Sequence, residues 1–172
     1  MPARSLANLI GFQLVWFACV WGGASGFPWF GVGLLAAVLG AHFYFPLAPW
    51  RRELVLLAAA GLLGLAAETL LHKGASVVGY PPQAWTGEPA PAWMLALWIN
   101  FAATLHGCLA WLRGKTPVAA VAGAVAGPLS YWGGERMGAI TLHPEPVYWL
   151  AGIGLIWAIA TPVLVWLAEV TA

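Results

Sequence analysis

The stretch "LVLLAAAGLLGLAAETLLH", residues 54–72, is apolar over almost its whole length and contains one carboxylate, Glu68. An α-helix needs about 20 predominantly apolar residues to cross the hydrocarbon core of a bilayer. The stretch therefore predicts a transmembrane helix. A charged side chain at the centre of such a helix costs roughly 2.5–3.5 kcal/mol on insertion scales, so the presence of Glu68 requires a structural or functional reason.

The composition extends this interpretation to the whole chain. Its 172 residues are 62% hydrophobic and include seven Lys or Arg and six Asp or Glu. A soluble domain has roughly one quarter charged residues, so the surface of this chain is expected to face lipid. A formal charge of +1 without a basic stripe argues against nucleic acid as a partner. Cys19 and Cys108 lie in apolar runs without disulfide or zinc spacing, and we expect them to pack in the interior.

Short hydrophilic breaks divide the chain into six apolar windows, which leave no room for a second domain. We therefore predict one all-α domain over 1–172, a polytopic transmembrane bundle of six helices. One longer connection, residues 73–90, is rich in proline and glycine, so it is either a surface loop or a partly re-entrant segment. The predicted helices cover about 7–24, 28–47, 54–72, 91–112, 116–134 and 147–168.

The distribution of Lys and Arg in the short loops predicts the orientation, because cytoplasmic loops carry the excess of positive charge. Five of these residues fall on one side of the predicted bundle, namely Arg4, Arg51, Arg52, Arg113 and Lys115. Two fall on the other side, Lys73 and Arg136. This asymmetry predicts a multi-pass protein of the cytoplasmic membrane with both termini in the cytoplasm and the 73–90 loop outside.

Twelve tryptophans are several times the ordinary usage, and most of them mark window ends, as in the aromatic belts of membrane proteins. Trp16, Trp98 and Trp157 lie deeper in their windows. An indole N–H at that depth needs an acceptor that lipid cannot supply. Gln13 and Asn100 are the candidate acceptors.

Several polar residues share the outer half of the predicted bundle. His72 follows Glu68 at a spacing of four residues, which places both on one helix face. Gly123 and Gly127 form a small-xxx-small pair in the fifth helix, and we predict that this face packs directly on another helix. The candidate binding cluster consists of Glu68, His72, Asn100, Tyr131, Glu135 and Arg136.

The residues alone leave two interpretations of these polar side chains open. Glu68 is either a buried structural hydrogen-bonding residue or a proton-transfer or substrate-binding residue. Glu135 and Arg136 are adjacent, so they point in different directions on a helix and pair poorly with each other. Arg136 is predicted to meet Glu68 or a headgroup phosphate. The alternative is that both residues form a terminal turn in water.

The remaining titratable residues do not predict a metal or cofactor site. His42, His106 and His143 fall in different segments, and His106 is interpreted as a hydrogen-bonded interior histidine. The sequence "WRRE" at 50–53 is interpreted as a topology anchor, with an anionic-lipid site as the alternative. No nucleotide-binding, dinucleotide-binding or hydrolase motif is found, so no cofactor is predicted.

Four strings together resemble a family of uncharacterised small bacterial inner-membrane proteins, a multi-helix domain of unknown function of about this length. They are "GFQLVWFACVWGGA" at 11–24, "PWRRELVLL" at 49–57, "PAWMLALWINFAATL" at 91–105 and "GPLSYWGGERMGA" at 127–139. The family carries an aspartate where this chain has Glu68. The resemblance implies a bacterial inner-membrane location and a link to membrane-lipid physiology, without naming a reaction.

Three functions are compatible with the sequence. The first is binding or movement of a lipidic or amphipathic small molecule through the outer polar cluster. The second is a small integral membrane enzyme that uses Glu68 and His72 for acid and base chemistry on a lipid. The third is a non-catalytic scaffold of a membrane complex. Membrane lipids and a lipidic small molecule are the expected partners, and whether the chain forms a homo-oligomer stays open.

Overall fold

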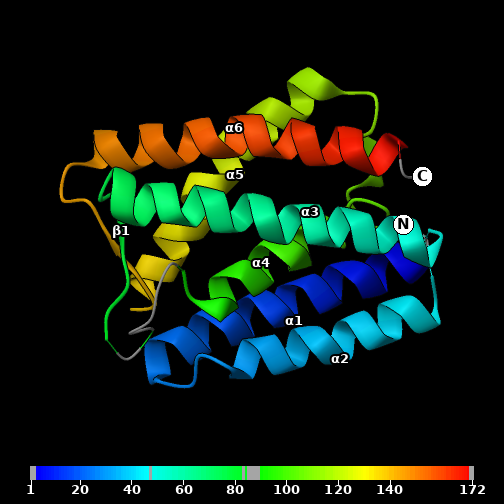
Figure 1. The fold of residues 1–172 in the computed structure, drawn as a ribbon, viewed down its shortest axis with the longest axis horizontal. Helices are drawn as coiled ribbons and strands as arrows, with labels where there is room; N and C mark the ends of the chain where they lie inside the picture. The colour runs from blue at the N-terminus through cyan, green and yellow to red at the C-terminus, as the bar shows by residue number, and fades with distance from the viewer. Residues whose placement is uncertain (1–2, 47, 83, 85–89, 171–172) are drawn as a thin grey trace.

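The structure, a computed structural model, describes residues 3–46, 48–82, 84 and 90–170. Within these residues the chain forms six α-helices, which confirms the predicted all-α class. Two one-turn helices, the π-helix Leu70–Gly74 and the 3-10 helix Ala110–Leu112, and the two-residue strands β1 (Val78–Gly79) and β2 (Thr141–Leu142) complete the fold. The six α-helices are α1 (Ala3–Ser25), α2 (Phe30–Tyr44), α3 (Trp50–Thr69), α4 (Ala92–Ala102), α5 (Thr116–Arg136) and α6 (Pro146–Val170) (Figure 1).

Three helical segments among the described residues are long and apolar enough to cross a bilayer. They are α1, α3 together with the π-helix that continues it, and α6. The helices α2 and α4 are apolar but shorter. The start of α1 and the end of α6 lie at the same end of the bundle, which also holds the α2–α3 and α4–α5 connections (Figure 1).

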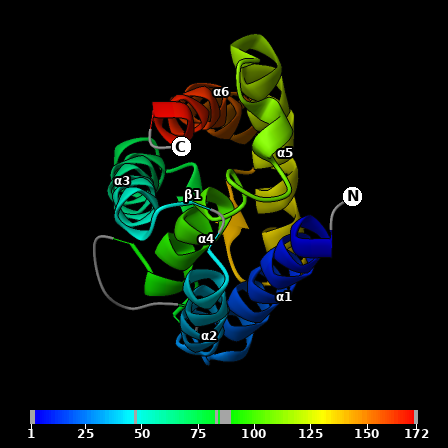
Figure 2. The same cartoon turned by 90° about the vertical axis from the view of Figure 1, so that its right-hand side faces the viewer.

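Helix α4 lies in the middle of the bundle and contacts α1, α2 and α3 (Figure 2). Its buried residues come from all around the helix, because neighbours surround it. They are Trp93, Met94, Ala96, Trp98, Asn100 and Ala102. The largest contact in the bundle is between α5 and α6, and apolar side chains are exposed on the outer faces of these two helices.

Two glycines allow the close approach of α5 and α6. A Cβ atom at Gly123 would overlap the backbone of Trp157 and the side chain of Thr161. A Cβ atom at Gly127 would overlap the Trp157 ring. The predicted packing of this glycine face on another helix is confirmed. In lipid, where helix association depends on van der Waals contact, such small residues let two backbones pack closely.

The predicted helix over 91–112 is too long, since α4 ends at Ala102. The cause is Asn8 of α1, whose side-chain amide donates to the Ala103 carbonyl at 3.0 Å and whose side-chain oxygen accepts from the Cys108 N–H at 3.0 Å. A Cβ atom at Gly107 would overlap this amide. The backbone groups freed by the end of α4 therefore find a side-chain partner, and residues 103–109 turn before the 3-10 helix.

The connection predicted as an irregular loop over 73–90 is more ordered than expected. Helix α3 continues into the π-helix through Gly74, and β1 then pairs with β2 as a short antiparallel ladder. Val77 and Val78 are buried in the core, so this part of the connection is not a free surface loop. Residues 83 and 85–89 of the predicted loop lie outside the described residues.

Replacing Gly127 with alanine should destabilise the protein by about 1–3 kcal/mol, because the added methyl group overpacks the contact with Trp157. Gly33 of α2 is the matched control, since a Cβ atom there meets nothing within 4 Å. Gly33→Ala should be neutral or stabilising through helix propensity. Thermal melting of both variants in detergent checks this, and equal melting temperatures would contradict the packing of α5 on α6.

Candidate functional site

Glu68, in the last turn of α3, is fully buried and is the centre of a hydrogen-bond cluster. Its Oε1 atom accepts from the indole N–H of Trp98 at 2.9 Å and from the hydroxyl of Tyr131. Its Oε2 atom accepts from the hydroxyl of Tyr80 at 2.7 Å. Both carboxylate oxygens are therefore occupied by neutral donors, as burial of this group requires.

The four side chains of this cluster come from four segments that the fold brings together. Glu68 belongs to α3, Trp98 to α4, Tyr131 to α5, and Tyr80 follows β1. Gly64, one turn before Glu68, makes the contact with α4 possible, because a Cβ atom there would overlap the Trp98 ring. The cluster therefore fixes the relative positions of α3, α4 and α5 near one end of the bundle.

His72 contacts this cluster at Tyr80. It lies in the π-helix, and its Nδ1 atom is 2.9 Å from the Val78 carbonyl oxygen. Its ring centroid lies 5.1 Å from that of Tyr80. Burial and the neighbouring Glu68 carboxyl raise the pKa of Tyr80 well above that of a free phenol. The Tyr80 hydroxyl consequently keeps its proton and remains a donor to Glu68.

The other three predicted cluster residues lie elsewhere. Asn100 is buried and donates to the Phe12 carbonyl of α1 at 3.0 Å. Glu135 accepts from the Leu142 N–H at 2.9 Å and thereby ties the end of α5 to β2. Arg136 was predicted to meet either Glu68 or a headgroup phosphate. It is exposed, whereas Glu68 is fully buried, so Arg136 does not meet Glu68. The structure thus brings Glu68 and Tyr131 together, with His72 beside them.

Trp98 and Tyr80 are members of the cluster that the sequence did not assign to it. The need of a deep indole for an acceptor was the right signal for Trp98, but the acceptor is Glu68 rather than Gln13 or Asn100. Gln13 is exposed on α1. The sequence around Tyr80 did not indicate that it contacts Glu68, because Tyr80 lies in a connection without helical periodicity.

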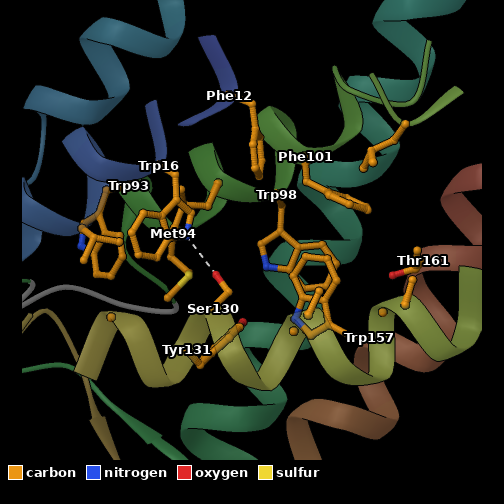
Figure 3. A pocket seen from close by; sticks show the side chains of 18 of the residues that line it. Phe12, Trp16, Trp93, Met94, Trp98, Phe101, Ser130, Tyr131, Trp157 and Thr161 are labelled. Carbon is orange, nitrogen blue, oxygen red and sulfur yellow. Dashed lines mark hydrogen bonds between the residues drawn. The ribbon is translucent and has the colours of Figure 1, made fainter. Parts of the chain in front are cut away.

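An apolar cavity of about 260 Å³ lies beside the cluster, between α1, α4, α5 and α6. Trp98 and Tyr131 both line it, so two of the donors to Glu68 form part of its wall (Figure 3). Glu68 itself is not among the residues that line the cavity. Trp16 of α1 donates to the hydroxyl of Ser130 of α5 at 2.9 Å and bridges the two helices across this cavity (Figure 3).

The cavity runs along α4 from one end of the bundle towards the other. Trp93 and Ile140 line one end, and Leu112 and Thr161 line the other. Thr161 is 2% exposed, and its hydroxyl has no hydrogen-bond partner among the described residues. Ala126 of α5 and Trp111 both line the cavity and are exposed, so the cavity reaches the outer surface at these two positions.

A second polar cluster, at the opposite end of α3, was not predicted. Glu53 in the first turn of α3 lies 2.7 Å from Nδ1 of His106 and 3.0 Å from Nε2 of His42. The interpretation of "WRRE" as a topology anchor did not predict that Glu53 is buried, with 1% of its surface exposed. Among the described residues, no three His, Cys, Asp or Glu side chains are arranged to hold a metal ion.

Replacing Glu68 with alanine should strongly destabilise the fold, because three donors lose their acceptor at roughly 1–3 kcal/mol per buried group. Glu68→Gln keeps one oxygen for Trp98 and Tyr131 and should destabilise it less. Exposed Glu145 provides the control substitution Glu145→Ala. The readout is the folded yield and melting temperature in detergent. A Glu68→Ala protein as stable as the wild type would show that the cluster does not support the fold.

Comparison with known proteins assigns the chain to a family. No curated protein and no solved structure matches it. One family model matches residues 5–163, which is most of the chain, and this confirms the family resemblance seen in the sequence. The chain belongs to the family described as "Protein of unknown function (DUF2878)".

Proposed function

We propose that the protein is a multi-pass membrane protein that binds one lipidic or amphipathic molecule in the cavity between α1, α4, α5 and α6. The observation that carries this proposal is the cavity itself, with its apolar wall and its opening at Ala126. Its volume, about 260 Å³, is close to the lower limit of roughly 300 Å³ for small-molecule sites. An apolar cavity of this kind stays dry and favours an apolar occupant.

The few polar atoms on the wall favour an amphipathic ligand over a pure hydrocarbon. Ser130 supplies a hydroxyl near the middle of the cavity, which accepts from Trp16 and can still donate its own hydrogen. Tyr131 and Thr161 also line the cavity, but the Tyr131 hydroxyl donates to Glu68 and the Thr161 hydroxyl is buried. Ligand sites are typically apolar with a small number of placed polar groups that orient the ligand. The Thr161 hydroxyl is buried against Gly123 and has no hydrogen-bond partner among the described residues, so a ligand could bond it only after the side chain turned towards the cavity.

The neighbouring surface supports access from the bilayer. On α1, Leu14 and Phe17 are exposed, and on α5, Val125 and Leu129 are exposed. These apolar side chains flank the two helices that the Trp16–Ser130 hydrogen bond joins. A chain-like molecule in the lipid phase would therefore reach the cavity by passing between α1 and α5, without crossing water.

The geometry favours binding over catalysis by Glu68 and His72. Glu68 is fully buried, both of its oxygens accept hydrogen bonds, and it does not line the cavity. A general acid or base must come within hydrogen-bond reach of the atom it protonates or deprotonates. Here Tyr131 and Trp98 stand between the carboxylate and a ligand. The contacts of Glu68 support a different role for it, which is to hold Tyr131 and Trp98 in position.

The membrane placement is part of the same proposal: six crossings of a bacterial inner membrane, with both termini in the cytoplasm. The fold supports this placement, because both termini lie at one end of the bundle (Figure 1). The same end carries five basic residues, namely Arg4, Arg51, Arg52, Arg113 and Lys115. Lys73 and Arg136 lie at the opposite end. Positive charge accumulates on the cytoplasmic side of membrane proteins.

Binding can be tested with a phospholipid whose acyl chain carries a photoreactive diazirine. We expect saturable labelling of about one molecule per chain, with adducts on α4 and α5 residues that line the cavity. Ala126→Phe should fill the opening and reduce this labelling at least about tenfold, since the ligand loses its space. Val125→Phe, one residue away and exposed, is the matched control. Equal labelling of both variants at the cavity peptides would refute the site.

Orientation can be tested by labelling single cysteines in intact cells with an impermeant maleimide. Cys19 and Cys108 are buried, so the native background should be low. Glu145→Cys and Lys115→Cys introduce exposed thiols at opposite ends of the bundle. We expect labelling at position 145 and, until the membrane is opened, none at 115. The reverse pattern would invert the proposed orientation.

A further inference from the structure

The second polar cluster joins four segments through one carboxylate. Glu53 Oε2 lies 2.7 Å from His106 Nδ1, and Glu53 Oε1 lies 3.0 Å from His42 Nε2. The side chains of Glu53, His106 and His42 are 1%, 2% and 7% exposed. His106 Nε2 lies 3.0 Å from the Ala168 carbonyl oxygen of α6. The cluster therefore links α2, α3, the 103–109 turns and α6.

The two partners of His106 determine how many protons the cluster holds. A backbone carbonyl can only accept, so the Nε2 atom that faces Ala168 must carry a hydrogen. The Nδ1 atom faces a carboxylate oxygen of Glu53, and a hydrogen bond there requires a further proton between the two atoms. That proton resides either on an imidazolium beside a carboxylate or on a carboxylic acid beside a neutral imidazole. In both cases the pair holds one proton more than a neutral histidine beside an ionised glutamate.

We propose that Glu53, His42 and His106 form a second functional site whose ligand is a proton. The proton is shared between Glu53 and His106, and His42 Nε2 lies 3.0 Å from the other carboxylate oxygen. Ala168 lies in the last turns of α6, where the helix dipole favours a positive charge. The bound proton therefore sits where both a carboxylate and a helix end attract it.

The surrounding charges modulate this site but do not replace the proton. Arg113 acts electrostatically on His106. Glu169 of α6 accepts from the Gly114 N–H at 2.5 Å, so its carboxylate is bonded beside the same connection. The other charged residues at this end are Arg4 of α1, Arg51 and Arg52 of α3, and Lys115 before α5.

Loss of the proton would bring two acceptors face to face. Either the Glu53–His106 bond or the His106–Ala168 bond would then break. His106 belongs to the 103–112 stretch, and Leu109, Trp111 and Leu112 of that stretch line one end of the apolar cavity. Proton release would therefore loosen the segment that lines this end. The proton count depends only on the geometry of the cluster and stands whether or not a lipid binds.

Nitrogen-15 NMR of the full chain in lipid nanodiscs, with labelled histidine, measures the proton directly. Signals are assigned with His42→Asn, His106→Asn and His143→Asn. At pH 7 we expect either a His106 ring protonated on both nitrogens, or an infrared band of a protonated carboxyl that disappears in Glu53→Gln. A His106 ring with one bare nitrogen beside an ionised Glu53 would overturn the proposal. This wild-type result decides the matter even where a variant fails to fold.

The pH dependence of thermal stability provides a second readout. The folded protein holds a proton that the unfolded chain gives up more readily, because the Glu53 contact raises the pKa of His106. The stabilisation is therefore present just below the ordinary histidine pKa of about 6.5 and is lost as the pH rises through release. We expect the melting temperature to fall by about 5 °C across this step. The step should vanish in His106→Asn and persist in His143→Asn, whose site lies at the opposite end. If the fall in melting temperature with pH were unchanged in His106→Asn, that result would contradict the proposal. Lipid labelling is measured separately, so failure of one site does not imply failure of the other.

Discussion

In the interior of a bilayer no water is available for polar groups, so each one must find its partner within the protein. This constraint organises the whole bundle. Glu68 accepts from three other segments, Asn8 of α1 satisfies the backbone where α4 ends, and Glu53 joins two histidines. Apolar surface makes the helices insert, but it is nearly uniform around them. The few polar side chains specify which faces meet and at what depth.

The sequence predicted what depends on local pattern and missed what depends on distant contacts. Apolar length was enough to find the helices, and small residues were enough to find the α5–α6 contact through Gly127. The end of α4 was missed because Asn8, far away in sequence, determines it. Trp98 was known to need an acceptor, but no local signal pointed to Glu68. Glu53 resembled a surface residue because arginines precede it, and its burial depends on how α2 and the 103–109 turns pack.

Helix α3 carries two buried carboxylates that have different chemistry. Glu68 and Glu53 are 15 positions apart, which is about 22 Å along a helix. The first meets tyrosine and tryptophan donors that keep their protons near neutral pH, so it acts as a fixed structural acceptor. The second meets the imidazoles of His42 and His106, which are themselves ionisable groups. A single helix thus separates a rigid end of the bundle from a responsive one, with the cavity-lining α4 between them.

The end of α4 at Ala102 also bears on how the protein is made. Residues 91–112 leave the ribosome as one apolar stretch that is long enough to insert as a continuous helix. Helix α1, which carries Asn8, is made before this stretch, because synthesis proceeds from the N-terminus. The stretch can therefore enter the bilayer as a straight helix and bend only when it docks against α1. Maturation of this protein would then include a late conversion from helix to turn within the membrane, driven by one asparagine side chain.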